Sequence, residues 1–108
     1  MAFGMKSFSL TTSAADLLTV PSGKAYVIIG LTMANIDGSA AASATLSTVD
    51  SDNSSKEAYI CSGVSVPAKA SFEPISGKLV LCAGDKLRGL ASADGDLEVT
   101  VSWMEMAA

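Results

Sequence analysis

The chain alternates between apolar and polar residues with a period of two, and this alternation constrains its fold more than any other feature. In the C-terminal stretch, one face of the alternation is apolar and consists of Leu97, Val99, Val101 and Trp103. Successive side chains of a β-strand point to opposite faces, so this stretch is predicted to be a strand with one buried face. Clusters of Gly, Pro, Asp and Ser separate similar stretches at intervals of about ten residues.

This pattern predicts an all-β protein with about eight strands and no substantial helix. The expected strands cover residues 5–11, 15–20, 24–36, 40–49, 56–66, 72–75, 79–81, 85–93 and 97–104. Many short strands joined by turns are typical of an antiparallel β-sandwich, either jelly-roll-like or a Greek key. The stretch 24–36 is apolar on both faces, which predicts a central or covered strand.

Two local features refine this prediction. Asp94-Gly95 separates the strands expected at 85–93 and 97–104, and such a turn signal predicts that the two pair as a hairpin. Gly63 interrupts the strand expected at 56–66 and predicts a β-bulge.

A chain of 108 residues suits one domain. We expect residues 13–108 to form a single β-sandwich domain, preceded by an N-terminal arm or edge strand at 1–12. The N-terminal stretch lacks the apolar run of a signal peptide, and no apolar run approaches the length of a membrane span. Turns at Pro21-Ser22-Gly23 and at Ser76-Gly77 are expected to precede new strands.

The composition argues against catalysis, metal binding and nucleic-acid binding. The chain contains no His, which excludes Ser-His-Asp and Cys-His catalysis and every zinc site that uses His. Its net charge is −4, whereas a protein that neutralises phosphates needs a basic face. We therefore expect no enzymatic activity, no catalytic residues, no cofactor, no metal, no nucleic-acid partner and no membrane partner.

Three sets of residues could suggest a site, and each has a simpler explanation. Asp50, Asp52 and Asn53 lack the spacing of a calcium-binding EF-hand loop, so a solvated turn is favoured. Asp94 and Asp96 flank a turn Gly, which favours a turn over a pair of catalytic carboxylates.

Cys61 and Cys82 form the third set. Each has an apolar neighbour, so they are expected to be small buried side chains. Without an export signal the thiols are expected to be reduced, although a disulfide between them is left open.

Apolar residues near both chain ends indicate self-association. The candidate contact residues for an oligomer or partner are Phe3, Met5, Phe8, Met104 and Met106. The N-terminal arm can add a strand to a neighbour's sheet edge, and the two C-terminal Met residues fall on the face of their strand opposite Trp103. Together with the doubly apolar strand, they imply more apolar surface than a monomer leaves in contact with water.

Parts of the sequence resemble small structural proteins of tailed bacteriophages. The resemblance rests on residues 17–24, 31–35, 75–91 and 97–105, including the runs Val20-Pro21-Ser22-Gly23-Lys24 and Leu81-Cys82-Ala83-Gly84-Asp85. At Cys82 the sequence departs from the resemblance, which has no cysteine there. The resemblance implies a β-sandwich building block of the virion without enzymatic activity.

This resemblance leads to a specific expectation. The chain is expected to be a capsid decoration (cement) protein that stabilises the head by binding the major capsid protein, assembled as a homotrimer in the bacterial host cytoplasm. A tail, collar or fibre component is the alternative, with other virion proteins as partners. A carbohydrate- or receptor-binding module is less favoured, because the chain has only three Phe, two Tyr and one Trp.

Overall fold

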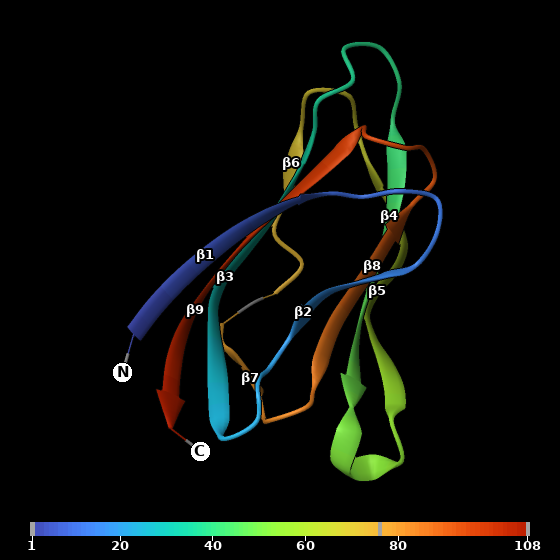
Figure 1. Ribbon diagram of the computed structural model, residues 1–108. Helices are drawn as coiled ribbons and strands as arrows, with labels where there is room; N and C mark the ends of the chain where they lie inside the picture. Colours follow the sequence, from blue (N-terminus) through green and yellow to red (C-terminus); the bar gives the residue numbers. More distant parts are fainter. Residues whose placement is uncertain (1, 76, 108) are drawn as a thin grey trace.

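The computed structural model describes residues 2–75 and 77–107 and shows two antiparallel sheets packed face to face (Figure 1). Met1 of the expected arm, Ser76 of the expected Ser76-Gly77 turn and the last residue, Ala108, lie outside the described residues. The all-β sandwich is therefore confirmed. Apart from one short 3₁₀ turn, the described residues form no helix, and they therefore contain no helix long and apolar enough to cross a membrane.

The first sheet, sheet A, contains five strands. Its order is β1 (Ala2–Ser9), β9 (Leu97–Ala107), β3 (Lys24–Asn35) and β6 (Ser71–Phe72), and β7 (Leu79–Leu81) also pairs with β3. Strand β3 thus lies inside sheet A, as its two apolar faces predict. The short strands β6 and β7 share its outer edge.

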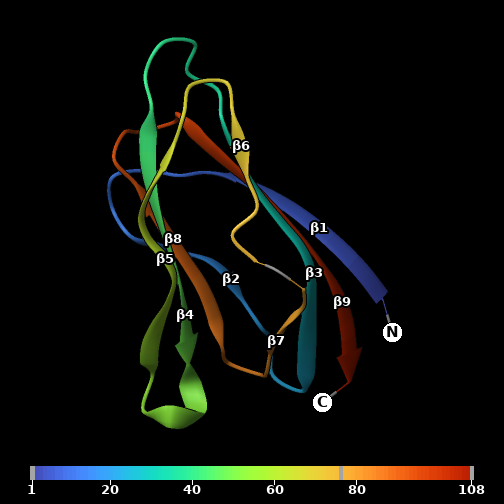
Figure 2. The same ribbon diagram turned by 180° about the vertical axis from the view of Figure 1, so that it is seen from behind.

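The second sheet, sheet B, contains four strands. Its order is β2 (Ala15–Thr19), β8 (Lys86–Ala91), β4 (Ala42–Asp50) and β5 (Lys56–Val66). The 3₁₀ turn η1 (Ser51–Asn53) joins β4 to β5. Seen from both sides, the start of β1 and the end of β9 lie at the same end of sheet A, and the turn of the β4–β5 hairpin extends beyond β2 and β8 (Figures 1 and 2).

The core fills the space between the sheets and follows the predicted alternation. Leu97, Val99 and Val101 of β9 are fully buried, and Leu46 and Leu87 are fully buried on the inner face of sheet B. Each such side chain contributes about 1.5–3 kcal/mol by leaving water. Trp103 continues the inner face of β9, packs against the core and stacks on Tyr26 with ring centroids 5.0 Å apart.

The predicted hairpin of residues 85–93 and 97–104 is wrong. Strand β8 belongs to sheet B and β9 to sheet A, so the chain crosses the sandwich at Asp94-Gly95. Gly95 donates its N–H to the carbonyl of Leu10 at 3.0 Å, and Thr12 donates its N–H to Asp94 Oδ1 at 2.8 Å. Turn residues specify a change of direction but not which sheet the next strand joins, and here the turn is bonded to the β1–β2 connection.

The bulge predicted at Gly63 is confirmed. The register of β4 and β5 shifts between the pairs Ala44–Val64 and Leu46–Cys61, so β5 has one extra residue there. Gly63 has a φ of 63°, a left-handed conformation that glycine adopts at little cost. Its N–H donates to Thr45 Oγ1 at 3.0 Å, which satisfies a backbone donor that the bulge removes from the ladder.

Candidate functional site

Each sheet has an outer face that no other part of the described chain covers, and a single row of side chains across the strands characterises each face. Side chains of directly paired residues point to the same side of a sheet. The register therefore shows which residues from distant parts of the sequence lie next to one another. These two rows are the candidate interaction surfaces of the protein.

The row on sheet A is apolar. Cross-strand pairing aligns Phe3 of β1 with Met104 of β9, Met104 with Val27 of β3, and Val27 with Val80 of β7. We call Phe3, Met104, Val27 and Val80 the apolar row. Phe3 is 74% exposed and Val80 is 58% exposed. The row lies near the start of β1 and toward the end of β9.

Four of the five predicted contact residues lie on this surface. Phe3 and Met104 belong to the apolar row, while Met5 and Met106 are two positions away on the same faces of β1 and β9. Phe3, Met5, Val80 and Met106 are all exposed large hydrophobic residues, so they form an apolar patch on this surface.

Phe8 is the exception. It points to the inner face of β1 and packs against the core, and its ring lies 5.6 Å from Lys6 Nζ. Residues 2–9 of the expected arm form β1, which pairs along its whole length with β9 of the same chain.

The shape of β1 depends on Gly4. Gly4 pairs with Trp103, and a Cβ atom at position 4 would lie 2.6 Å from the indole ring. Because Trp103 is stacked on Tyr26, the ring has little freedom to move away. Glycine therefore lets β1 lie flat beside β9 and hold Phe3 and Met5 on the outer face.

The row on sheet B is polar. Cross-strand pairing aligns Asp16 of β2 with Arg88 of β8, Arg88 with Ser47 of β4, and Ser47 with Tyr59 of β5. We call Asp16, Arg88, Ser47 and Tyr59 the polar row. Glu57, two positions from Tyr59 on the same face of β5, completes the group.

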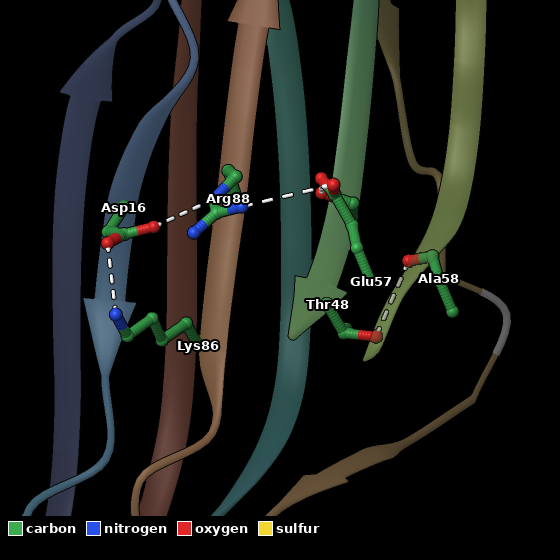
Figure 3. Close-up of polar contacts among 7 residues, drawn as sticks. Asp16, Thr48, Glu57, Ala58, Lys86 and Arg88 are labelled. Atoms are coloured by element: carbon green, nitrogen blue, oxygen red, sulfur yellow. Dashed lines mark hydrogen bonds and ion pairs between the residues drawn. The ribbon is translucent and has the colours of Figure 1, made fainter. Parts of the chain in front are cut away.

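Ion pairs and hydrogen bonds hold the polar row in place (Figure 3). Arg88 lies between two carboxylates: its Nε donates to Asp16 Oδ1 at 2.8 Å, and its Nη1 is 3.9 Å from Glu57 Oε1. Lys86 Nζ also contacts Asp16, at 3.4 Å. Hydrogen bonding to Arg88 lowers the pKa of Asp16 below its ordinary value. Ser47 is buried, and its hydroxyl donates to Glu57 Oε2 at 2.6 Å.

The oxygen-rich cluster near Asp50 has a structural role. Residues 51–53 form η1, and the backbone N–H and hydroxyl of Ser51 donate to Asp85 Oδ1 at 3.0 and 3.1 Å. Asp85 Oδ2 accepts the N–H of Cys82 at 2.9 Å. Asp85 thus joins the β4–β5 connection to the turn before β8. The described residues contain no group of three or more potential metal ligands.

The two cysteines differ. Both are free, and Cys61 is half-buried, where desolvation raises the pKa of its thiol. The prediction that both are buried is wrong for Cys82, which is exposed. Leu81 points into the core, so alternation directs the next residue outward.

Sequence reasoning missed the polar row and the buried Asn35. The members of the polar row come from four separate strands, and no local motif shows that they share a face. The side-chain amide of Asn35 donates to the carbonyls of Ala40 and Val66 at 3.0 and 2.9 Å, and its oxygen accepts the N–H of Asp37. Asn35 followed by Asp37-Gly38 was a detectable turn signal.

No family model and no curated protein sequence matches the chain. Among solved structures, a subunit of the disulfide-linked pili of Bacillus endospore appendages is 11% identical, with a TM-score of 0.54. That match covers 98% of this chain and 85% of the pilus subunit. At this identity it shows a shared fold only.

Two phage capsid structures are more distant in shape. A pentameric capsid protein from metagenomic phage sequences has a TM-score of 0.48 and 18% identity, and the match covers 95% of this chain. The chain spans 62% of the length of that capsid protein. The capsid of cyanophage Pam1 has a TM-score of 0.41 and 19% identity, covering 94% of this chain and 80% of the other.

Proposed function

We propose that the chain is a non-enzymatic structural subunit of a tailed-bacteriophage particle: a capsid decoration protein that assembles as a homotrimer in the host cytoplasm and binds the major capsid protein. The observation that carries the proposal is the apolar row on the outer face of sheet A. A soluble monomer gains nothing from aligning Phe3, Met104 and Val80 on an open sheet face. The sequence resemblance to phage structural proteins supports the virion as the place where this face is covered.

The proposed mechanism is passive. A standard interface removes about 800 Å² from water on each partner, and the apolar row with Met5 and Met106 supplies exposed apolar side chains for part of that area. Subunits held together in a trimer bind neighbouring sites on the head at a high effective concentration, so weak individual contacts yield strong overall binding. This arrangement requires no titrating group and no cofactor.

The test is solution mass by light scattering, followed by co-sedimentation with empty heads of a phage that encodes this chain. We expect a trimer that sediments with the heads. Phe3→Ser with Met5→Ser is expected to weaken head binding at least about tenfold, because aromatic side chains at interface centres often contribute more than 1 kcal/mol. Ile36→Ser, at an exposed apolar residue in a loop, is the matched control and should bind normally.

The outcomes separate the candidate roles. A trimer that does not bind heads would favour a tail, collar or fibre component. A monomer that ignores heads would contradict the proposal. Deleting residues 1–9 is expected to abolish head binding with the sandwich still folded, but this deletion also removes strand β1 from sheet A. The double substitution is therefore the cleaner test.

A further inference from the structure

A cleft of about 170 Å³ opens on the outer face of sheet B beside the polar row. Its walls include Thr45 of β4, Glu57 and Tyr59 of β5, and Arg88 and Leu90 of β8. The cleft lies on the opposite side of the sandwich from the apolar row. The proposed function makes no use of these residues.

The polar walls of the cleft are held in place before any ligand arrives. Asp16 orients Arg88 through the 2.8 Å bond to Nε, and the buried hydroxyl of Ser47 orients Glu57 through the 2.6 Å bond to Oε2. Figure 3 shows the Arg88 guanidinium and the Glu57 carboxylate directed toward each other, with Nη1 3.9 Å from Oε1, and both residues line the cleft. Fixed donors and acceptors reduce the ordering cost of binding.

Tyr59 supplies a flat apolar surface at the rim. It is 63% exposed although it is a large aromatic residue in the middle of a strand. An aromatic face beside planar charged groups matches the two sides of a sugar ring, which has a face of C–H groups and an edge of hydroxyls. The tyrosine hydroxyl adds one more donor and acceptor.

The charges around the cleft argue against an ionic ligand. Two carboxylates, Asp16 and Glu57, oppose two cations, Arg88 and Lys86, so the group as a whole is close to neutral. Arg88 is paired on both sides and is not free to neutralise a phosphate or a carboxylate. An uncharged ligand with many hydroxyls can bond to these groups without removing any of them from its partner.

We propose that this cleft binds one ring of a neutral carbohydrate, stacked on Tyr59 and hydrogen-bonded to Arg88 and Glu57. The cleft is smaller than the roughly 300 Å³ of pockets for drug-sized ligands, which limits it to one ring. Because the binding free energy scales with the number of ligand atoms in contact, a single hexose is expected to bind with a dissociation constant in the millimolar range. This inference is independent of the proposed function, because it concerns the other face of the molecule.

The test is an NMR titration of the full chain with glucose, galactose, N-acetylglucosamine and rhamnose, each raised to about 100 mM to match the expected affinity. At least one sugar should shift the amide signals of residues near 45, 59 and 88 in a saturable way. Tyr59→Ala should weaken that binding about tenfold, while Tyr59→Phe, which keeps the ring, should change it by less than about threefold.

Phe3→Ser, on the opposite face, serves as the matched control and should bind the sugar like the unaltered chain. The proposal is overturned if no sugar shifts these signals, if the shifts lie elsewhere, or if Tyr59→Ala binds equally well. The spectrum of each variant reports its own folding, so a misfolded variant is recognised before the titration. Head binding is measured separately, which keeps failure here distinct from failure of the decoration role.

Discussion

The outer faces of the two sheets have the same geometry and opposite chemistry. Each carries one row of four side chains in direct register, from Phe3 to Val80 on sheet A and from Asp16 to Tyr59 on sheet B. The charged groups of the polar row form ion pairs with groups of the same chain. The side chains of the apolar row have no covering partner within the described part of the chain, and they leave water only when another surface covers them.

The polar groups on sheet B find their partners when the chain folds, whereas the apolar side chains on sheet A are covered only when the protein assembles with a partner. Ion pairs on the face of sheet B need no partner, so that face can remain in contact with solvent. The exposed side chains on sheet A contribute to stability only when a partner covers them. If sheet A faces the head in the proposed particle, the cleft beside Tyr59 faces outward.

The largest expected effect concerns β1, the strand that carries Phe3 of the apolar row. Gly4→Ala places a Cβ atom 2.6 Å from the Trp103 ring and is expected to lower the free energy of unfolding by about 1–3 kcal/mol through overpacking. Denaturant unfolding monitored by Trp fluorescence measures the change.

Gly30→Ala is its control, because no atom lies within 4 Å of a Cβ built there. It should leave stability unchanged or raise it slightly, since Ala restricts the unfolded chain. Equal losses in the two variants would show that β1 does not lie against Trp103 as described.

A smaller effect is expected within the polar row. Ser47→Ala removes the buried hydroxyl that donates to Glu57 and should cost about 1 kcal/mol in the free energy of unfolding. Ser43→Ala is the control on the same strand, since Ser43 bonds to Ser92 through its backbone N–H. If both variants unfold at the same denaturant concentration, the Ser47–Glu57 bond contributes nothing to stability.

The smallest effect is expected at the charged end of the polar row. Asp16→Asn should cost less than about 1 kcal/mol at neutral pH, because the Asp16 and Arg88 side chains are each about a third exposed and solvent screens the pair. Unfolding titrations at several pH values measure it.

The pH dependence has a definite sign. Arg88 lowers the pKa of Asp16 in the folded protein below the ordinary value of 3.8, so the ionised carboxylate stabilises the folded state. That contribution is complete well above pH 3.8 and is lost as the pH falls through the lowered folded value. The difference between Asp16→Asn and the unaltered chain should therefore shrink in acid. A difference that grows in acid would contradict the pairing with Arg88.

Alternation and turn chemistry predicted most of the strands correctly. They placed β9, located β3 inside a sheet, and positioned the bulge at Gly63, because each of these features depends on neighbours in the sequence. The same local information failed at Asp94-Gly95. The strands β8 and β9 lie in different sheets, and the turn between them contacts Leu10 and Thr12, more than eighty residues earlier.

The candidate surfaces show the same division. Exposed apolar residues near both chain ends predicted four of the side chains now found together, but not their alignment with Val27 and Val80. The polar row was not predicted at all, because no local pattern around Asp16 indicates that its side chain lies beside Ser47 or Tyr59. Register between distant strands decides which residues become neighbours, and a shift of one residue would turn either row toward the core.

The amino-acid sequence by itself therefore determined the all-β class, the inner face of β9 and the absence of histidine chemistry. These properties follow from the period of two, from turn residues and from composition, all of which are local. Only the tertiary structure decided which strands share a sheet and which side chains form the two outer rows. The physical reason is that long-range pairing is selected by the packing of the whole core, to which residues distant in the sequence contribute together.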